Sequence, residues 1–321
     1  MYIIAKLTKK RILETVLNNK SLIVITGPTA SGKTSLSLKL AKKLNCDIIS
    51  ADSRQFYREM NIGTAKPTKK ELDAVNHHFI NNISIFDDYD VGMYKKEVEA
   101  FLENYFKNNN HIIITGGTGL YIEALIEGLN EFPDVEKDII KNLEKIYSDK
   151  GIEALQDKLK KIDPDYFSKV DKNNHHRLIR AISVFEQSGI PYSAFLKKDK
   201  NKIKYKSINI LLELPRKELY DRINTRVDEM ILNGLEKEAK ELFPHRNLKA
   251  LNTVGYKELF KYFEGEITLE EAISLIKRNT RRYAKRQMTW FNNRGTWSKF
   301  SPFDFEGILA FVNKSLKPEV A

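Results

Sequence analysis

The chain has 321 residues, 41% hydrophobic and 30% charged, which suits a large packed core with a wet surface, and its net charge of +11 favours a polyanionic partner without identifying one. No stretch is long and apolar enough to span a membrane, and residues 1–20 lack the cleavage site of a secretory signal, so we expect a globular, cytosolic protein. The single cysteine, Cys46, excludes an intrachain disulfide framework and is interpreted as a small buried side chain, and no zinc finger can be written.

The first motif is a glycine-rich segment between a predicted strand and a predicted helix. Apolar residues at 22–25 predict the strand, and leucines at helical spacing begin just after Thr34. The segment between them fits G-x-x-x-x-G-K-[ST], in which backbone N–H groups surround a phosphate, the lysine reaches the terminal phosphates and the hydroxyl binds Mg²⁺. We therefore expect a phosphate loop with Mg²⁺ as the cofactor. Its residues are Gly27, Pro28, Thr29, Ala30, Ser31, Gly32, Lys33 and Thr34.

A second predicted strand, at 47–50, leads into Asp52. Functional groups gather at the carboxyl ends of parallel strands, so Asp52 is expected to face the same crevice as the phosphate loop. There it can hold Mg²⁺ through water or take a proton from a nucleophile, whereas capping of its own turn is the structural alternative. Residues 61–67 contain a glycine and a proline and are predicted to form a loop, in which Lys66 is interpreted as a solvated side chain, with added charge in the crevice as the alternative.

A third predicted strand, at 111–115, follows a predicted crossover helix at 91–107. It ends in Gly-Gly-Thr rather than in the acidic residue that a nucleoside triphosphatase places there for magnesium and the attacking water. Hydrolysis of a nucleoside triphosphate is therefore not the favoured chemistry. Thr118 is predicted to bind an anionic or polar substrate, with a helix cap as the alternative.

Residues 129–200 have a helical pattern and are interpreted as an insertion that divides the core into 1–128 and 201–321. Helices are predicted at 139–147, 152–161 and 175–187. The last of these carries His176, Arg177 and Arg180, and the two arginines share one face; we interpret them as phosphate contacts, with a salt-bridged surface as the alternative. The lysine-rich segment 197–206 is interpreted as a solvated linker.

The core is predicted to resume with a strand at 207–214 and a helix that begins at Pro215. Arg222 and Arg226 lie four residues apart, on one face of this helix, where they can clamp a leaving group in the crevice.

The strongest basic feature lies between residues 251 and 294, and residues 274–299 contain eight lysines and arginines and no acidic residue. Arg278, Arg281, Arg282 and Lys285 follow the spacing of one helical stripe. Aromatic residues are interleaved with it and can pack inside or stack on unpaired bases. The stripe favours a nucleic-acid partner. The aromatic residues are Tyr256, Tyr283, Trp290 and Phe291.

Six segments in order resemble those of the bacterial tRNA dimethylallyltransferase (tRNA isopentenyltransferase) family, and the resemblance runs from about residue 21 to 297. It implies an α/β fold with a P-loop NTPase-like parallel sheet, a mainly helical insertion and a helical, basic C-terminal region. The segments are 27–34 (GPTASGKT), 50–55 (SADSRQ), 62–67 (IGTAKP), 116–121 (GGTGLY), 254–259 (VGYKEL) and 284–291 (AKRQMTWF).

The resemblance also implies a reaction: transfer of a dimethylallyl group from dimethylallyl diphosphate to the exocyclic amine of the adenosine just 3′ of the anticodon. Asp52 matches the general base, which acts on an adenine taken out of its stack. Lys33, Thr34 with Mg²⁺, and Arg226 match the groups that neutralise the departing diphosphate, and Thr118 matches a residue near the donor and the base.

The residues expected to contact the anticodon stem-loop come from the same resemblance and from the basic stripe. Ser53 and Gln55 match positions that hold the target adenine. We expect a monomer, and residues 1–20 match nothing with an assigned role. The full set is Asp52, Ser53, Arg54, Gln55, Thr118, His176, Arg177, Arg180, Gly255, Tyr256, Arg281, Arg282, Lys285, Arg286, Gln287 and Trp290.

Three alternatives remain open at this stage. A prenyltransferase that acts on free adenine nucleotides shares the donor chemistry, but it does not need so many basic residues for one nucleotide. A P-loop kinase of small molecules would hold ATP in the loop and use Asp52 as its base. A non-catalytic RNA-binding module would need neither Lys33 nor Asp52.

Overall fold

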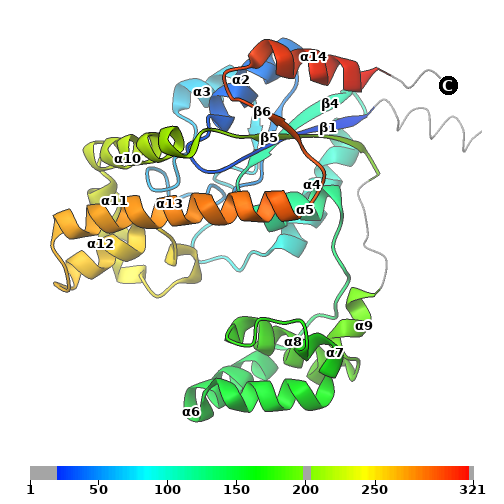
Figure 1. The fold of residues 1–321 in the computed structure, drawn as a ribbon, viewed down its shortest axis with the longest axis vertical. Helices are drawn as coiled ribbons and strands as arrows, with labels where there is room; N and C mark the ends of the chain where they lie inside the picture. The colour runs from blue at the N-terminus through cyan, green and yellow to red at the C-terminus, as the bar shows by residue number, and fades with distance from the viewer. Residues whose placement is uncertain (1–19, 198–203, 318–321) are drawn as a thin grey trace, which may run out of the picture. The chain divides into compact units, whose positions relative to one another are not determined.

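The computed structural model describes residues 20–197 and 204–317 (Figure 1). The chain divides into two compact units, one formed by the described residues up to 126 together with those from 204 onward, and the other by residues from 127 to 197. The predicted N-terminal extension and most of the lysine-rich linker lie outside the described residues. Within the described ranges, no helix has the length and apolarity needed to cross a bilayer.

The larger unit is built on a six-stranded sheet in the order β3-β2-β4-β1-β5-β6, with every pair of neighbours parallel. This confirms the α/β fold class and the four predicted strands, although β5 ends two residues earlier than expected and the short strands β3 and β6 were not predicted. The strands are β1 (Ser21–Thr26), β2 (Ile48–Ser50), β3 (His77–His78), β4 (His111–Gly116), β5 (Lys206–Leu212) and β6 (Ser298–Phe300).

Helices cover both faces of the sheet because the strands are apolar on both sides. On one face, Ile23 and Ile25 of β1 pack with α2 (Lys33–Leu44) and α14 (Phe305–Leu316), and Cys46 is buried there as predicted. On the other face, Leu22 and Val24 pack with α4 (Val91–Tyr105), the expected crossover helix. The remaining helices of this unit are α3 (Lys69–Ala74), α5 (Gly119–Ile126), α10 (Arg216–Leu232), α11 (Leu235–Leu242), α12 (Tyr256–Phe263) and α13 (Leu269–Asn293).

The smaller unit is mainly helical, and its first ten residues, 127–136, form no helix. It contains α6 (Lys137–Ile162), α7 (Pro164–Phe167), α8 (His175–Ser188) and α9 (Tyr192–Leu196). The two helices predicted at 139–147 and 152–161 are confirmed as the two parts of α6, which are separated by the non-helical backbone of Gly151, where φ is 77°. Leu155 and Leu159 of α6 pack against Ile182 of α8 in a separate hydrophobic core.

A carboxylate on α11 fixes the loop 61–67 of the larger unit. Glu238 accepts hydrogen bonds from the backbone N–H groups of Asn61 (2.9 Å), Ile62 (2.8 Å) and Gly63 (3.0 Å). The hydroxyl of Tyr256, a residue without solvent exposure, donates to the same carboxylate at 2.7 Å. The loop therefore has a defined position even though it contains no regular secondary structure.

Two further observations define this loop. A Cβ on Gly63 would lie 2.6 Å from the Tyr256 ring, so only glycine fits against the ring. The interpretation of Lys66 as a solvated side chain is wrong. Lys66 donates to the carbonyl of Tyr57 and to Asn61 Oδ1, and burial lowers the pKa of its ammonium group to about 8.

We expect the substitution Glu238→Ala to lower the free energy of unfolding by about 1–3 kcal/mol, because it leaves the Tyr256 hydroxyl and the loop N–H groups without their acceptor. Glu241→Ala is the control, since Glu241 is exposed on the same helix. Chemical denaturation of both variants measures the effect, and equal midpoints for the two would contradict it.

Candidate active site

The phosphate loop adopts a conformation that its glycines make possible. It runs from the end of β1 to the start of α2, with φ of 149° at Gly27 and 92° at Gly32, values that side-chain-bearing residues rarely adopt. A Cβ on Gly27 would lie 2.8 Å from the carbonyl oxygen of Leu212. Among the described residues, the buried hydroxyl of Ser31 has no hydrogen-bond partner, so the loop keeps a polar group available for a ligand.

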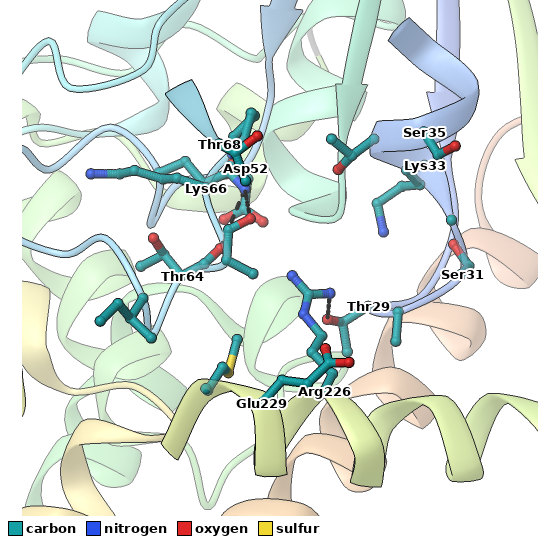
Figure 2. Close-up of a pocket in the computed structure, with 18 of the residues that line it drawn as sticks. Thr29, Ser31, Lys33, Ser35, Asp52, Thr64, Lys66, Thr68, Arg226 and Glu229 are labelled. Carbon is teal, nitrogen blue, oxygen red and sulfur yellow. Dashed lines mark hydrogen bonds between the residues drawn. The ribbon is translucent and has the colours of Figure 1, made fainter. Parts of the chain in front are cut away.

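A cavity of about 1040 Å³ opens in front of this loop. Figure 2 shows Ser31, Lys33 and Ser35 on one side, Thr64, Lys66 and Thr68 on the opposite side, and Arg226 and Glu229 of α10 between them. Apolar side chains also contribute to its lining. They are Ala30, Ile62, Ala65, Leu72 and Met230. The cavity thus combines cationic and apolar side chains in its lining.

Two partly buried cations face the cavity. Lys33 Nζ donates to the carbonyl oxygens of Gly27 (3.0 Å) and Pro28 (2.7 Å), and Arg226 Nη1 donates to Thr29 Oγ1 (3.4 Å; Figure 2). Burial lowers the pKa of Lys33 to about 7, an effect that Asp52 opposes and Arg226 reinforces. Burial also lowers the pKa of Arg226, again opposed by Asp52. An anion bound between the two cations would offset the energetic cost of their desolvation.

Asp52 lines the same cavity, in the turn that follows β2. One carboxylate oxygen accepts a hydrogen bond from the Arg54 backbone N–H at 3.1 Å, so the capping alternative also occurs. Thr118 Oγ1 accepts from the Ser53 N–H at 3.1 Å, and its hydroxyl lies 3.3 Å from Ser53 Oγ. The structure therefore brings together Asp52, Ser53 and Thr118 from two separate strand ends.

Gln55 and Arg54 are occupied by contacts within the protein. The Gln55 amide donates to the carbonyls of Thr64 and Ala65, both at 3.3 Å, and fixes the loop opposite the phosphate loop. The Arg54 guanidinium donates to the Ala250 carbonyl at 2.9 Å. These contacts shape the cavity wall around the place where an adenine was expected.

Two site residues on α13 differ from their predictions. Tyr283, one of the aromatic residues predicted to pack inside or to stack on unpaired bases, lines the cavity, and burial together with nearby Asp52 raises its pKa. Gln287, predicted to contact tRNA, is only 5% exposed. Its Oε1 accepts from the Thr29 N–H and its Nε2 donates to the Gly117 carbonyl, both at 2.8 Å. The four-residue spacing from Tyr283 to Gln287 to Phe291 was the available sequence signal for this face.

Four of the eight basic residues at 274–299 are occupied by contacts within the protein. Lys277 pairs with Asp228 (2.6 Å), Arg294 with Glu123 (2.7 Å) and Lys299 with Glu213 (2.7 Å). Arg281 donates to Asn224 Oδ1 at 2.7 Å and lies over the Tyr220 ring, so it belongs to the contact between α13 and α10. Of the eight basic residues at 274–299, the exposed ones without a salt bridge to a described acidic residue are Arg278, Arg282, Lys285 and Arg286.

The remaining residues expected at the tRNA fall into two groups. Gly255 and Tyr256 are buried and present no surface to an RNA, which corrects that expectation. Trp290 is half-buried beneath Arg294, whose guanidinium lies 4.2 Å from the centre of the ring system. His176, Arg177 and Arg180 are exposed on α8 in the smaller unit.

No cluster of three or more metal-binding His, Cys, Asp or Glu side chains occurs in the described part of the chain. Mg²⁺ is commonly bound by one or two protein oxygens together with ligand phosphates. Thr34 and Asp52 line the cavity and supply oxygens of that kind, so the donor set fits a metal bound jointly with a diphosphate.

The chain is similar to known transferases over most of its length. A family model described as IPP transferase matches residues 55–294. The tRNA dimethylallyltransferase of Christiangramia forsetii is 53% identical over 270 residues, covering 84% of this chain and 89% of that protein. The enzyme of the same name from Flavobacterium johnsoniae is 45% identical over 309 residues, covering 94% and 100%.

Solved structures of transferases that act on tRNA are also similar to this chain. A full-length tRNA isopentenylpyrophosphate transferase from Bacillus halodurans superposes with a TM-score of 0.69 and 39% identity, covering 92% of this chain and 97% of that one. A eukaryotic dimethylallyltransferase acting on tRNA superposes with a TM-score of 0.78 and 25% identity, covering 92% and 77%.

We expect inorganic diphosphate to bind with uptake of a proton by Lys33 at pH 8, because a pKa near 7 leaves most of this amine neutral there and a bound anion raises the pKa again. Calorimetry in buffers of different ionisation enthalpy measures the uptake. Lys33→Met is the control, since protonation of the ligand itself contributes equally to both proteins. Equal proton uptake by the two proteins would show that Lys33 is already charged in the free site.

Proposed function

The chain belongs to the IPP transferase family, and we propose that it transfers the dimethylallyl group of dimethylallyl diphosphate to the exocyclic amine of the adenosine immediately 3′ of the tRNA anticodon, releasing diphosphate. One observation carries the proposal: the carboxylate of Asp52 lines the same cavity as the phosphate loop and its two cations. A base and a leaving-group site in one cavity are what a transfer to a nitrogen nucleophile requires.

The donor occupies the phosphate loop in this proposal. Loop N–H groups, Lys33 and Arg226 bind the diphosphate, and the dimethylallyl group packs against apolar side chains such as Ile62 and Met230. Because Lys33 and Arg226 are partly desolvated, their attraction for a developing negative charge is stronger than it would be in water. The two cations therefore stabilise the departing diphosphate.

The chemical step is a substitution at the allylic carbon. The adenine amine forms a C–N bond as the C–O bond to the diphosphate breaks, and the electron pair of that bond leaves with the diphosphate. Asp52 accepts the proton that the nitrogen loses. The Thr118 hydroxyl, which is bonded to the residue after Asp52, keeps the turn in place during this transfer.

Mg²⁺ is part of the proposal, with the Thr34 hydroxyl as a direct ligand and Asp52 as a ligand through water. When bound, the ion neutralises phosphate charge. Both residues line the cavity, and this placement supports the assignment.

The anticodon stem-loop is the proposed RNA substrate. Arg282, Lys285 and Arg286 give α13 an exposed basic surface, and Arg177 and Arg180 give α8 another. We further propose that the enzyme acts as a monomer in the cytoplasm.

A transfer assay tests the proposed function. Purified protein, Mg²⁺, dimethylallyl diphosphate and unmodified tRNA with adenosines after the anticodon are expected to give prenylated adenosine, detected by mass spectrometry of nucleosides. Asp52→Asn keeps the shape but cannot accept a proton, so we expect it to abolish turnover and to leave tRNA affinity nearly unchanged. Prenylation of free adenine nucleotides alone, or transfer of label from ATP to a small acceptor, would establish one of the alternatives.

We expect the double substitution Arg282→Ala with Lys285→Ala to reduce the salt dependence of tRNA binding by about one unit of slope per lost phosphate contact. Arg281→Ala is the matched control in the same stripe, and its slope is expected to stay close to that of the unsubstituted protein because Asn224 already binds this guanidinium. Filter binding across a series of salt concentrations gives the slopes. An unchanged slope in the double variant would place both side chains outside the RNA interface.

A further inference from the structure

The Gln287 side chain joins two loops that lie far apart in the sequence. It bridges Thr29 of the phosphate loop and Gly117 of the turn after β4, with both hydrogen bonds at 2.8 Å. Among the described residues, it makes the only side-chain hydrogen bond from α13 to the phosphate loop. At 5% exposure the amide is shielded from water, so solvent does not replace either partner when the bond is lost.

The Gln287 amide packs closely against the turn after β4. A Cβ on Gly117 would lie 2.3 Å from Gln287 Nε2, so the side chain lies directly against bare backbone. Similarly, a Cβ on Gly116 would lie 2.4 Å from the backbone of Ala51, the residue before Asp52. The end of β4 therefore packs directly against the turn that carries Asp52, with no space for a side chain at Gly116.

These contacts form a continuous path from the donor side of the cavity to the base. It starts at Thr29, whose hydroxyl also accepts from Arg226, and passes through the Gln287 amide to Gly117. The next residue, Thr118, is bonded to Ser53 beside Asp52. Thr26 at the end of β1 also donates from Oγ1 to the Gly116 carbonyl at 3.0 Å, and the Gln287 amide adds the link from Thr29 within the phosphate loop to Gly117 within the turn.

We propose that Gln287 is a positioning residue: it holds the phosphate loop in register with the turn that bears Asp52, so that the leaving group and the base keep the separation the transfer needs. The role of the base rests on the proposed function, whereas the bridge to the phosphate loop does not. Misplacing reacting groups by about 1 Å can cost about 100-fold in rate, so loss of the bridge lowers kcat more than it lowers substrate affinity.

Gln287→Met tests this inference, because methionine has a similar length and makes neither hydrogen bond. We expect kcat at saturating substrates to fall by about 10- to 100-fold, the Kd for inorganic diphosphate to rise a few-fold and the Kd for tRNA to stay within about twofold. Thr289→Ala is the control, since Thr289 is exposed on the same helix and has no part in the site.

Gln287→Glu supplies a second readout that simple destabilisation would not give. An ionised carboxylate keeps the bond from the Thr29 N–H but repels the Gly117 carbonyl, whereas a protonated carboxyl donates to that carbonyl and restores both bonds. Burial raises the pKa of the introduced group, so kcat relative to the unsubstituted protein is expected to recover as the pH falls. Gln287→Met shows no such recovery.

Two results would overturn the inference: a kcat for Gln287→Met within about twofold of the unsubstituted protein, or a loss of tRNA affinity as large as the loss of kcat, which would mean that α13 itself is displaced. Failure of the unsubstituted protein to prenylate tRNA would instead overturn the proposed function. In that case the diphosphate affinity of Gln287→Met decides the bridge alone, and an unchanged affinity refutes it.

Discussion

The site depends on two partly buried cations, Lys33 and Arg226, that line one cavity with the Asp52 carboxylate as their common anionic neighbour. Burial lowers the pKa of both Lys33 and Arg226, and the Arg226 charge lowers the pKa of Lys33 further. Lys33 is satisfied only by loop carbonyls, and Arg226 by a threonine hydroxyl at 3.4 Å. Such an arrangement destabilises the free protein and favours whatever anion enters. The rest of the fold keeps these charges in place despite that cost.

The order of the strands explains why the functional groups meet. The neighbours β2, β4 and β1 are parallel, so their carboxyl ends lie at one edge of the sheet. Asp52, Thr118 and the phosphate loop follow these strand ends. They meet although the paired strand residues Thr26 and Gly116 are 90 residues apart in the sequence. This is why the sequence sufficed to predict the crevice: buried strands are apparent from their apolar runs, and parallel strands place their following loops together.

The side-chain contacts that the sequence did not predict are made with residues distant in the chain. Helical or strand periodicity does not identify such residues. A helical spacing assigns Tyr283, Gln287 and Phe291 to one face, but it does not say whether a polar member of that face meets solvent, substrate or another loop. Likewise Arg281 fits the basic stripe by spacing, and only the position of Asn224 on a neighbouring helix shows that it points inward. Lys66 was misjudged for the same reason, since its acceptors belong to residues that approach it through tertiary folding.

Helix α13, which has 25 residues, combines apolar packing, hydrogen bonds to the site and exposed basic side chains in one element. Its small Ala284 packs against Leu219 and Ile223 of α10, which brings the two helices close together and sets Arg226 opposite the phosphate loop. Three residues further along the helix, Gln287 accepts a hydrogen bond from that loop, while Lys285 and Arg286 are exposed to solvent. A helix that is packed, hydrogen-bonded and charged on different faces cannot move one of these contacts without the others. An RNA held by the outer face would therefore be held in a fixed relation to the donor loop, which removes the need for a separate device to align the two substrates.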